Sequence, residues 1–291
     1  MKLDIQGHSG CDIAIVYEDN ELHIHKSTHD AGYVPRLVNQ ANKQIAASHR
    51  EYQNIRVPKI FDVERSDTQA TIKMEYIYSK NFVEYFENAG FEQIKYLIGA
   101  ITYFVDLEIN ASSMQVVPAN VLTDKMSDVA RKVAGNTHLQ DDNDAQELVR
   151  RSQLVMDGVG DMTMPVGTCH GDLTFSNILF NGNNYYLIDF LDSFIESPLL
   201  DIVKIRQDTA YLWSTLMYSK PFDKVRLSIV SEKIDKAIDD YFSAHYQWYR
   251  QYYMPLQLMN FLRILQYAHD EKVIAYLKRV IAGQLATIEK L

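Results

Sequence analysis

The sequence predicts an α+β protein made of a small β-rich N-terminal lobe and a large, mainly helical C-terminal lobe. Short runs of alternating apolar and polar residues dominate the first 78 residues, as expected for half-buried strands. Apolar residues at helical spacing dominate from residue 198 to the end. We place the boundary near residues 77 to 80, which gives an N-lobe of residues 1–78 and a C-lobe of residues 79–291.

The composition is typical of a globular protein and excludes several classes of partner. The 291 residues are 47% apolar, which is ample for a buried core. The net charge of -9 provides no basic field, so nucleic acid is not an expected partner. The most apolar stretch, YLIGAITYFVDL, is too short and too interrupted to span a bilayer, so we expect no membrane insertion.

The cysteines and the first residues bear on location. Cys11 and Cys169 lie far apart with no CxxC spacing, which argues against a disulfide framework and against a structural zinc site. The start, MKLDIQGHSG, lacks the apolar core of a secretory signal. Both observations favour a reducing, cytoplasmic location.

Four strands and one helix are expected in the N-lobe. The helix lies in YVPRLVNQANKQIAASHREY, which begins near a proline and carries Leu37, Ala41, Ile45 and Ser48 close to helical spacing. The turn EDN separates the first two strands. The expected strands are DIAIVY (12–17), ELHIHKS (21–27), VPKIFDVE (57–64) and ATIKMEYI (70–77).

The C-lobe begins with a helical pattern over residues 91–109. Residues 121–164 are polar, with a turn-rich stretch between two helical patterns, and we expect a solvated surface segment or an insertion. Aromatic residues gather between Tyr241 and Tyr253. Packing within the helical lobe is the favoured interpretation, and aromatic faces for a cationic or sugar-like acceptor are the alternative.

The most informative pattern is CHGDLTFSNILF, residues 169–180, followed by YYLIDFLDS, residues 185–193. Asp172 and Asn177 precede one apolar run, Asp189 follows a second, and the turn NGNN joins the two runs as a predicted hairpin. Such a hairpin brings the three side chains together. Their oxygen atoms suit a magnesium ion that also binds substrate phosphates.

One carboxylate of this set then remains to orient an attacking hydroxyl, as phosphoryl transfer requires. Aspartate and asparagine are also common in turns, and that is the alternative interpretation of either residue alone. The combined spacing with the second acid favours the site.

HGDLTFSNILF and YLIDFLD together resemble the catalytic and metal-binding loops of the aminoglycoside phosphotransferase and choline kinase group, which has a bilobal protein-kinase-like fold. The resemblance implies that Asp172 is the catalytic base, that His170 braces its loop, and that Asn177 and Asp189 bind magnesium. It further implies ATP- and Mg²⁺-dependent transfer of a γ-phosphoryl group to a small-molecule hydroxyl. The acceptors of the group include amino sugars, sugars, choline-like alcohols and precursors of glycan or lipid head groups.

The same resemblance assigns nucleotide contacts in the N-lobe. Lys26, at the end of ELHIHKS, has the position of the strand lysine that holds the α and β phosphates. Ser9 and Gly10 lie in a loop that could cover the phosphates with backbone N–H groups. Backbone groups of Glu75 to Ile77, in KMEYIYSKN, are expected to meet the adenine.

The sequence departs from the group where a glutamate should follow on the N-lobe helix. Gln40 and Gln44 stand there, and no acid occurs before Glu51. Either glutamine can orient Lys26 by a hydrogen bond, but neither pairs with its charge, so we expect weaker phosphate anchoring or a carboxylate from elsewhere. A catalytically weak nucleotide-binding regulatory module of the same fold is therefore the alternative function.

Two further aspartates follow the metal-binding motif. Asp201 is expected to have a structural role, as a helix N-cap or brace. Asp192 either faces the metal or acceptor or is a surface turn residue. The sequence does not indicate an oligomeric state.

Overall fold

The computed structural model describes residues 2–6 and 11–290 of the chain. These residues form two compact units. Unit 1 contains residues 1–107, 170–193 and 222–230, and unit 2 contains residues 108–169, 194–221 and 231–291. The predicted α+β class is confirmed, since N-terminal strands precede a mainly helical part. The functional boundary at residue 78 stays a prediction.

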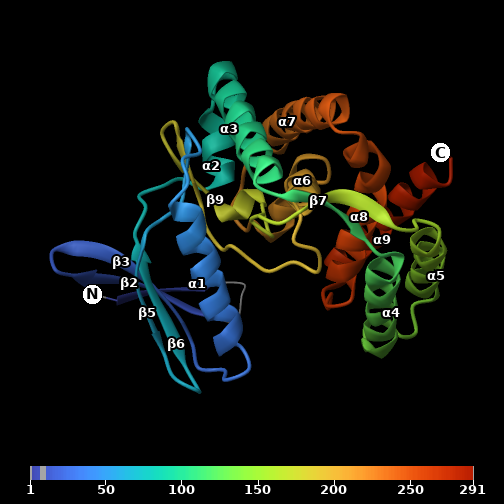
Figure 1. The fold of residues 1–291 in the computed structure, drawn as a ribbon, viewed down its shortest axis with the longest axis horizontal. Coiled ribbons are helices and arrows are strands. Elements are labelled where there is room, and N and C mark those ends of the chain that lie inside the picture. The colour runs from blue at the N-terminus through green and yellow to red at the C-terminus, as the bar shows by residue number, and fades with distance from the viewer. Residues whose placement is uncertain (1, 7–10, 291) are drawn as a thin grey trace. The chain divides into compact units, whose positions relative to one another are not determined.

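A five-stranded antiparallel sheet forms the first part of unit 1 (Figure 1). The strand order is β1-β2-β3-β6-β5, so β3 is central. On β3, Lys26 lies opposite Ile13 of β2 and Ile72 of β6. The strands are β1 (Lys2–Gln6), β2 (Asp12–Glu18), β3 (Glu21–Thr28), β5 (Ile60–Arg65) and β6 (Ala70–Glu75).

Helix α1 (Val34–Ser48) lies along this sheet and contacts β5 and β6 (Figure 1). Leu37 and Ala41 of the helix pack on Ile72 and Met74 of β6, which confirms the predicted helix. Its buried face also includes Gln40 and Gln44. Burial of these two glutamines in place of Ile45 and Ser48 differs from the expected apolar spacing.

The rest of unit 1 is built around a second, three-stranded sheet of order β4-β10-β9. The predicted hairpin is confirmed, because β9 (Ile178–Asn181) pairs antiparallel with β10 (Asn184–Leu187). Helix α2 (Phe82–Asn88) begins with a capping box, in which Asn81 and Glu84 each bind the other's backbone N–H. The remaining elements are β4 (Ile55–Arg56), the single-turn helix η1 (Phe175–Asn177) and most of α3 (Phe91–Asn110).

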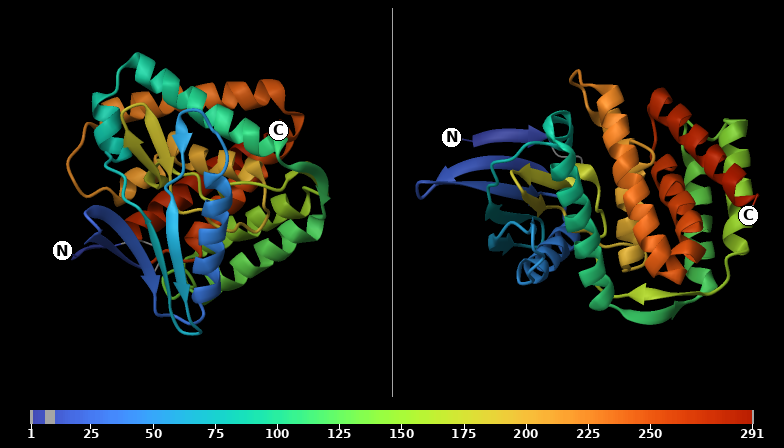
Figure 2. Two further views of the ribbon diagram at one scale, coloured as in Figure 1. Left: turned by 60° about the vertical axis from the view of Figure 1, so that its left-hand side comes forward. Right: turned by 90° about the horizontal axis from the view of Figure 1, so that it is seen from above.

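Unit 2 is mainly helical. Figure 2 shows α4 and α5 beside α8 and α9, and these helices pack on one another. Strands β7 and β8 form a two-stranded sheet. The elements are β7 (Ser113–Val117), α4 (Ala119–Gly135), α5 (Asn143–Asp157), β8 (Met162–Val166), α6 (Pro198–Thr209), η2 (Trp213–Met217), most of α7 (Lys224–His245), α8 (Gln247–Leu265) and α9 (Glu271–Ile288).

The expectation that residues 121–164 form a solvated surface segment is wrong, whereas their interpretation as an insertion stays a prediction. Helices α4 and α5 bury an apolar face each, and both pack on α8. The segment looks polar because its apolar residues occupy only one side of each helix. The buried residues include Leu122, Met126, Val129, Val133, Leu148, Val149 and Met156.

The aromatic residues between Tyr241 and Tyr253 serve packing, as favoured. Trp248, Tyr249 and Tyr253 are buried. The hydroxyl of Tyr249 donates to Asp239 at 2.7 Å and accepts a bond from Arg206 at 2.6 Å.

Arg206 of α6 is the centre of a buried charged cluster in unit 2. Its guanidinium binds both carboxylate oxygens of Asp235 on α7 at 2.8 and 2.9 Å, and one oxygen of Asp239 at 2.6 Å. The guanidinium also lies 4.4 Å from the centre of the Tyr253 ring. The cluster thereby ties α6, α7 and α8 together.

The structure bears on two expectations from the sequence, one about the cysteines and one about membrane-spanning helices. Cys11 and Cys169 are both buried and unbridged, so the prediction that they form no disulfide is confirmed. Among the residues that the structure describes, no helix combines the length and the apolarity needed to cross a membrane.

We expect Arg206→Met to lower the free energy of unfolding by about 3 kcal/mol, because it leaves the largely buried carboxylate of Asp235 without its cation. Urea unfolding followed by circular dichroism measures this change. Lys236→Met removes the exposed i,i+4 pair with Asp240 and serves as the matched control. Equal effects of the two variants would contradict a structural role for the cluster.

Candidate active site

His170 is the buried centre of the loop that carries the predicted catalytic residues. The ring is fully buried. Its Nε2 is 2.9 Å from the carbonyl oxygen of Ile188, and its Nδ1 accepts a bond from the backbone N–H of Asp172 at 3.2 Å. Nε2 therefore carries the proton and Nδ1 does not. In this way one neutral ring joins the Asp172 loop to the end of β10.

Burial lowers the pKa of His170 to about 4, and the nearby ammonium of Lys43 acts in the same direction. The ring therefore stays neutral at physiological pH, which keeps both of its hydrogen bonds in place.

Asn177 fixes the carboxylate of Asp172. The amide nitrogen of Asn177 donates to Oδ2 of Asp172 at 2.9 Å and to the backbone oxygen of the same residue at 2.8 Å. The backbone oxygen of Asn177 accepts a bond from the N–H of Ile188 at 3.1 Å, which places the residue beside the start of the Asp189 loop. The predicted convergence of Asp172, Asn177 and Asp189 is thus present.

Asp189 accepts a charged hydrogen bond from Lys26 of β3, and both residues belong to unit 1. The ammonium nitrogen of Lys26 lies 2.7 Å from Oδ1 of Asp189. The lysine side chain is 5% exposed and that of the aspartate 33%. Asp189 has a φ of 61°, in the left-handed region that residues with a Cβ rarely adopt and that costs about 1–3 kcal/mol. The ion pair helps to hold this conformation.

The structure assigns the role of the two glutamines. Gln40 accepts a bond from Lys26 at 3.3 Å, and its amide nitrogen donates to the hydroxyl of Tyr33 at 3.2 Å. Gln44 instead donates to the carbonyl oxygen of Pro58 at 2.9 Å. Gln40 thus orients the lysine, and the carboxylate expected from elsewhere is that of Asp189.

The catalytic and metal-binding loops touch at Gly171. The backbone N–H of Leu191 donates to the carbonyl oxygen of His170 at 2.9 Å. Gly171 has a φ of +87°, and a Cβ placed on it would lie 1.9 Å from the carbonyl oxygen of Leu191. Only glycine fits this approach.

The donor set fits a magnesium ion. Asp189 offers a carboxylate that solvent reaches, and Asn177 offers an amide oxygen, since its amide nitrogen is engaged with Asp172. Both are hard oxygen ligands of the kind that magnesium accepts together with water and substrate phosphates. Within residues 2–6 and 11–290, no group of three or more His, Cys, Asp or Glu side chains is arranged to hold a metal, so the two would need such outside ligands.

The remaining predicted residues are placed as follows. Glu75 ends β6 and binds the backbone N–H of Lys59 at 3.1 Å, and Ile77 is buried two residues later. Their adenine contacts stay a prediction. Ser9 and Gly10 lie outside the residues that the structure describes.

The structure overturns one interpretation of Asp201 and leaves both interpretations of Asp192 as predictions. Asp201 is buried inside α6, and the N-cap of this helix is Ser197. The cap prediction was therefore wrong, because the serine directly before Pro198 takes that position. Asp192 is exposed and accepts a bond from Asn39 at 2.6 Å.

Sequence reasoning missed the contribution of helix α1 to this site. Asn39 binds Asp192, and the ammonium of Lys43 donates to the carbonyl oxygen of Leu191 at 2.6 Å. A signal was present, since Asn39, Gln40 and Lys43 lie within one helical turn of each other. It passes unnoticed because polar residues on a helix are usually solvated.

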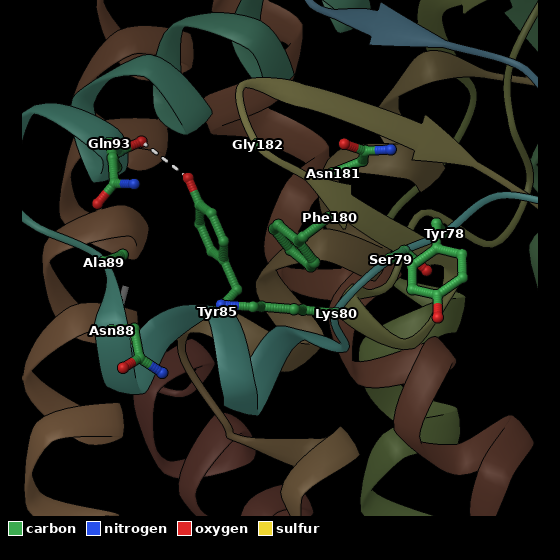
Figure 3. A pocket seen from close by; sticks show the side chains of 10 residues that line it. All are labelled: Tyr78, Ser79, Lys80, Tyr85, Asn88, Ala89, Gln93, Phe180, Asn181 and Gly182. Atoms are coloured by element: carbon green, nitrogen blue, oxygen red, sulfur yellow. Dashed lines mark hydrogen bonds between the residues drawn. The ribbon is translucent and has the colours of Figure 1, made fainter.

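A pocket of about 350 Å³ lies elsewhere in unit 1, behind the segment that follows β6 (Figure 3). The ring of Tyr85 stacks on Phe180 with 4.4 Å between ring centres, and its hydroxyl approaches the backbone oxygen of Gln93 at 3.5 Å (Figure 3). Glu75 and Ile77 are not part of its lining, so this pocket is distinct from the predicted adenine contact.

Solved structures with a similar fold include aminoglycoside phosphotransferases. Apo aminoglycoside phosphotransferase APH(4)-Ia, as a thermostable mutant, aligns with 99% of this chain and 94% of its own at a TM-score of 0.64 and 9% identity. The same protein is known in a ternary complex with ADP and hygromycin B, at a TM-score of 0.64 and 8% identity, with 99% and 94% of the two chains covered.

The GDP and kanamycin complex of APH(2")-IIia is similar to the same extent. It aligns with 99% of this chain and 93% of its own at a TM-score of 0.65 and 14% identity. At these identities the likeness shows the fold, which is the protein-kinase-like fold of aminoglycoside phosphotransferases. No curated protein sequence matches the chain.

The fold and the loop residues together define a kinase-like phosphotransferase. A family model described as the phosphotransferase enzyme family matches residues 108–252, about half of the chain, including both loops. The chain belongs to this family, and the resemblance seen in its sequence is confirmed. It is an enzyme of the small-molecule kinase class, which phosphorylates hydroxyl groups.

We expect the stability of the protein to fall between pH 6.5 and about 4 because of His170. The unfolded ring binds a proton below its ordinary pKa of about 6.5, whereas the buried ring does not until about 4. The stabilising contribution is therefore complete above pH 6.5 and is lost as the pH falls through this window, at about 1.4 kcal/mol per pH unit.

Urea unfolding of the parent and of His170→Gln at several pH values between 7 and 4 tests this expectation. The variant should show a shallower pH dependence, by about one proton. Parallel pH profiles would contradict the neutral buried ring.

We expect Gly171→Ala to abolish most activity and to lower the melting temperature, because the added Cβ collides with the Leu191 carbonyl and separates the two loops. Gly182→Ala is the matched control, since Gly182 has a φ of 59° with nothing within 4 Å of its Cβ position. It should cost about 1 kcal/mol from conformation alone. Similar melting temperatures and activities in the two variants would refute the loop contact.

Proposed function

We propose that the protein transfers the γ-phosphoryl group of ATP, in a magnesium-dependent reaction, to a hydroxyl group of a small molecule. The observation that carries this proposal is the contact network of one carboxylate fixed by an amide, a second carboxylate beside it, and a buried lysine that faces the second carboxylate. These groups match the requirements of phosphoryl transfer, which needs positioning and charge neutralisation more than covalent chemistry.

Asp172 is assigned the role of catalytic base. Asn177 holds its Oδ2, and this bond sets the plane of the carboxylate. An acceptor hydroxyl that donates to Asp172 is held in line for attack. Its proton passes to the carboxylate as the new P–O bond forms, while the bond between the γ phosphorus and the β–γ bridging oxygen of ATP breaks and ADP leaves. His170 acts on this step only by positioning, since its ring contacts the backbone of Asp172.

Lys26 is assigned to the nucleotide phosphates. Its ammonium nitrogen lies 2.7 Å from Oδ1 of Asp189. When phosphate oxygens arrive, they offer the ammonium a second anionic partner, and Gln40 keeps the side chain aimed. Asp189 and Asn177 would hold the magnesium ion, which supplies charge neutralisation on the phosphates.

The proposed acceptors are amino sugars, sugars, choline-like alcohols and head-group precursors of glycans or lipids. Related folds bind hygromycin B and kanamycin, so aminoglycosides belong in a panel without being presumed. The net charge of -9 is compatible with neutral and cationic acceptors.

The test is ADP release from magnesium-ATP across this acceptor panel, with magnesium-GTP run in parallel. We expect acceptor-dependent release by the parent. Asp172→Asn keeps the shape but not the base, and it should reduce turnover by about 10²–10⁴-fold while nucleotide binding persists.

Asp67→Asn is the matched control, because Asp67 is exposed in the turn between β5 and β6. It should leave turnover unchanged. Equal turnover by the parent and Asp172→Asn would refute the catalytic assignment. Nucleotide binding with no turnover on any acceptor would replace the proposal by the catalytically weak regulatory module.

A further inference from the structure

Two side chains of helix α1 bind two consecutive residues of the loop after Asp189. Asn39 donates to the carboxylate of Asp192 at 2.6 Å, and Lys43 donates to the carbonyl oxygen of Leu191 at 2.6 Å. The two side chains are four residues apart, so they leave the same side of the helix. Together they bind both residues that follow Phe190.

Leu191 is the point at which this helix and the catalytic loop meet. Its N–H donates to the carbonyl oxygen of His170, and its carbonyl oxygen lies against Gly171 and receives the Lys43 ammonium. Any shift of Leu191 therefore moves the Asp189 loop relative to Asp172. Lys43 opposes such a shift with a charge-assisted hydrogen bond.

The helix is a rigid base for these contacts. Leu37 and Ala41 are buried in the core between α1 and the five-stranded sheet. Gln44 is also buried and tied to the carbonyl oxygen of Pro58. Side chains on this helix can therefore set the position of a loop that has little regular structure of its own.

Ligand binding would affect the contact of Lys26 differently from those of Lys43 and Asn39. Lys26 shares Asp189 with the predicted metal and is itself assigned to phosphate. Lys43 instead donates to the backbone oxygen of Leu191 and Asn39 to Asp192, and neither Lys43 nor Asn39 is assigned to phosphate or metal in the proposed reaction. They are thus the contacts that can hold α1 to the loop throughout a catalytic cycle.

We propose that Lys43, assisted by Asn39, is a positioning residue. It holds Asp189 at the position relative to Asp172 that the predicted metal site requires. This inference rests on the proposed function. Lys43 links α1 to the site through a bond to a backbone oxygen. A glutamate on this helix would make the link by pairing with the strand lysine. Residues that orient metal ligands typically affect metal affinity or activity by about 10–100-fold.

The test compares Lys43→Met, Lys43→Arg and Asn39→Ala with the parent. Lys43→Met should raise the half-saturating magnesium concentration for turnover by about tenfold and reduce kcat by about tenfold. The KM for ATP at saturating magnesium should stay close to the parental value. Lys43→Arg should restore most of both losses, because guanidinium also donates to a carbonyl oxygen.

A second readout does not depend on turnover. The dissociation constant of Mn²⁺ in the presence of ADP, measured by electron paramagnetic resonance, should rise about tenfold in Lys43→Met. Lys95→Met is the matched control, since it removes an exposed lysine of α3 in the same unit. It should leave metal binding and turnover unchanged.

Parental metal binding and kcat in Lys43→Met would overturn the inference, and so would equal losses in Lys95→Met. If Lys43→Met fails to fold, Asn39→Ala decides, and unchanged Mn²⁺ binding in that variant overturns the inference. A parent that binds no Mn²⁺–ADP and releases no ADP refutes the proposed function itself. If the parent is active and the variants have the same Mn²⁺ affinity and kcat as the parent, only the inference is refuted.

Discussion

A buried lysine needs an anionic partner, and in this protein that partner lies 163 positions further along the chain. Lys26 on the central strand of the N-terminal sheet is 5% exposed on its side chain, and an unpaired ammonium there would cost several kcal/mol. Asp189 is this partner, with its Oδ1 2.7 Å from the ammonium nitrogen of Lys26. Satisfying one buried charge thereby brings the segment after β10 to the sheet, and it places Lys26 beside the carboxylate that we propose as a metal ligand.

The second constraint is the space available to backbone. Gly171 and Leu191 approach so closely that no side chain fits between them. His170 contributes from the other side, since its neutral ring holds the carbonyl oxygen of Ile188 and the N–H of Asp172 together. Bonds to main-chain atoms thus hold the two loops beside each other, and the side-chain bonds of Asn177 and Lys26 then orient the carboxylates.

Much of this was predictable from the sequence, and what was not has physical reasons. The hairpin after Asn177 follows from turn chemistry between two apolar runs, and it brings the segments of Asp172 and Asp189 to the same end of the two strands. The choice between Gln40 and Gln44 depends on rotation of α1 about its axis, which spacing does not fix when both glutamines are buried. Residues 121–164 were misjudged because each of α4 and α5 hides only one face. The spacing of Asn39 and Lys43 places them on one side of α1, but their partners Asp192 and Leu191 are 153 and 148 positions further along the chain, so the spacing does not show what they bind.

The pairing of Lys26 with Asp189 also means that the chain itself supplies a counter-ion for its buried ammonium. In the proposed reaction, a metal ion alone would compete with this ammonium for the Asp189 carboxylate, whereas a metal bound to phosphate would bring an anion to which the ammonium can transfer its ion pair. Binding is then an exchange of ion pairs in which the number of buried charges without a partner never rises. Metal and nucleotide should accordingly enter together, as a single electrically balanced complex.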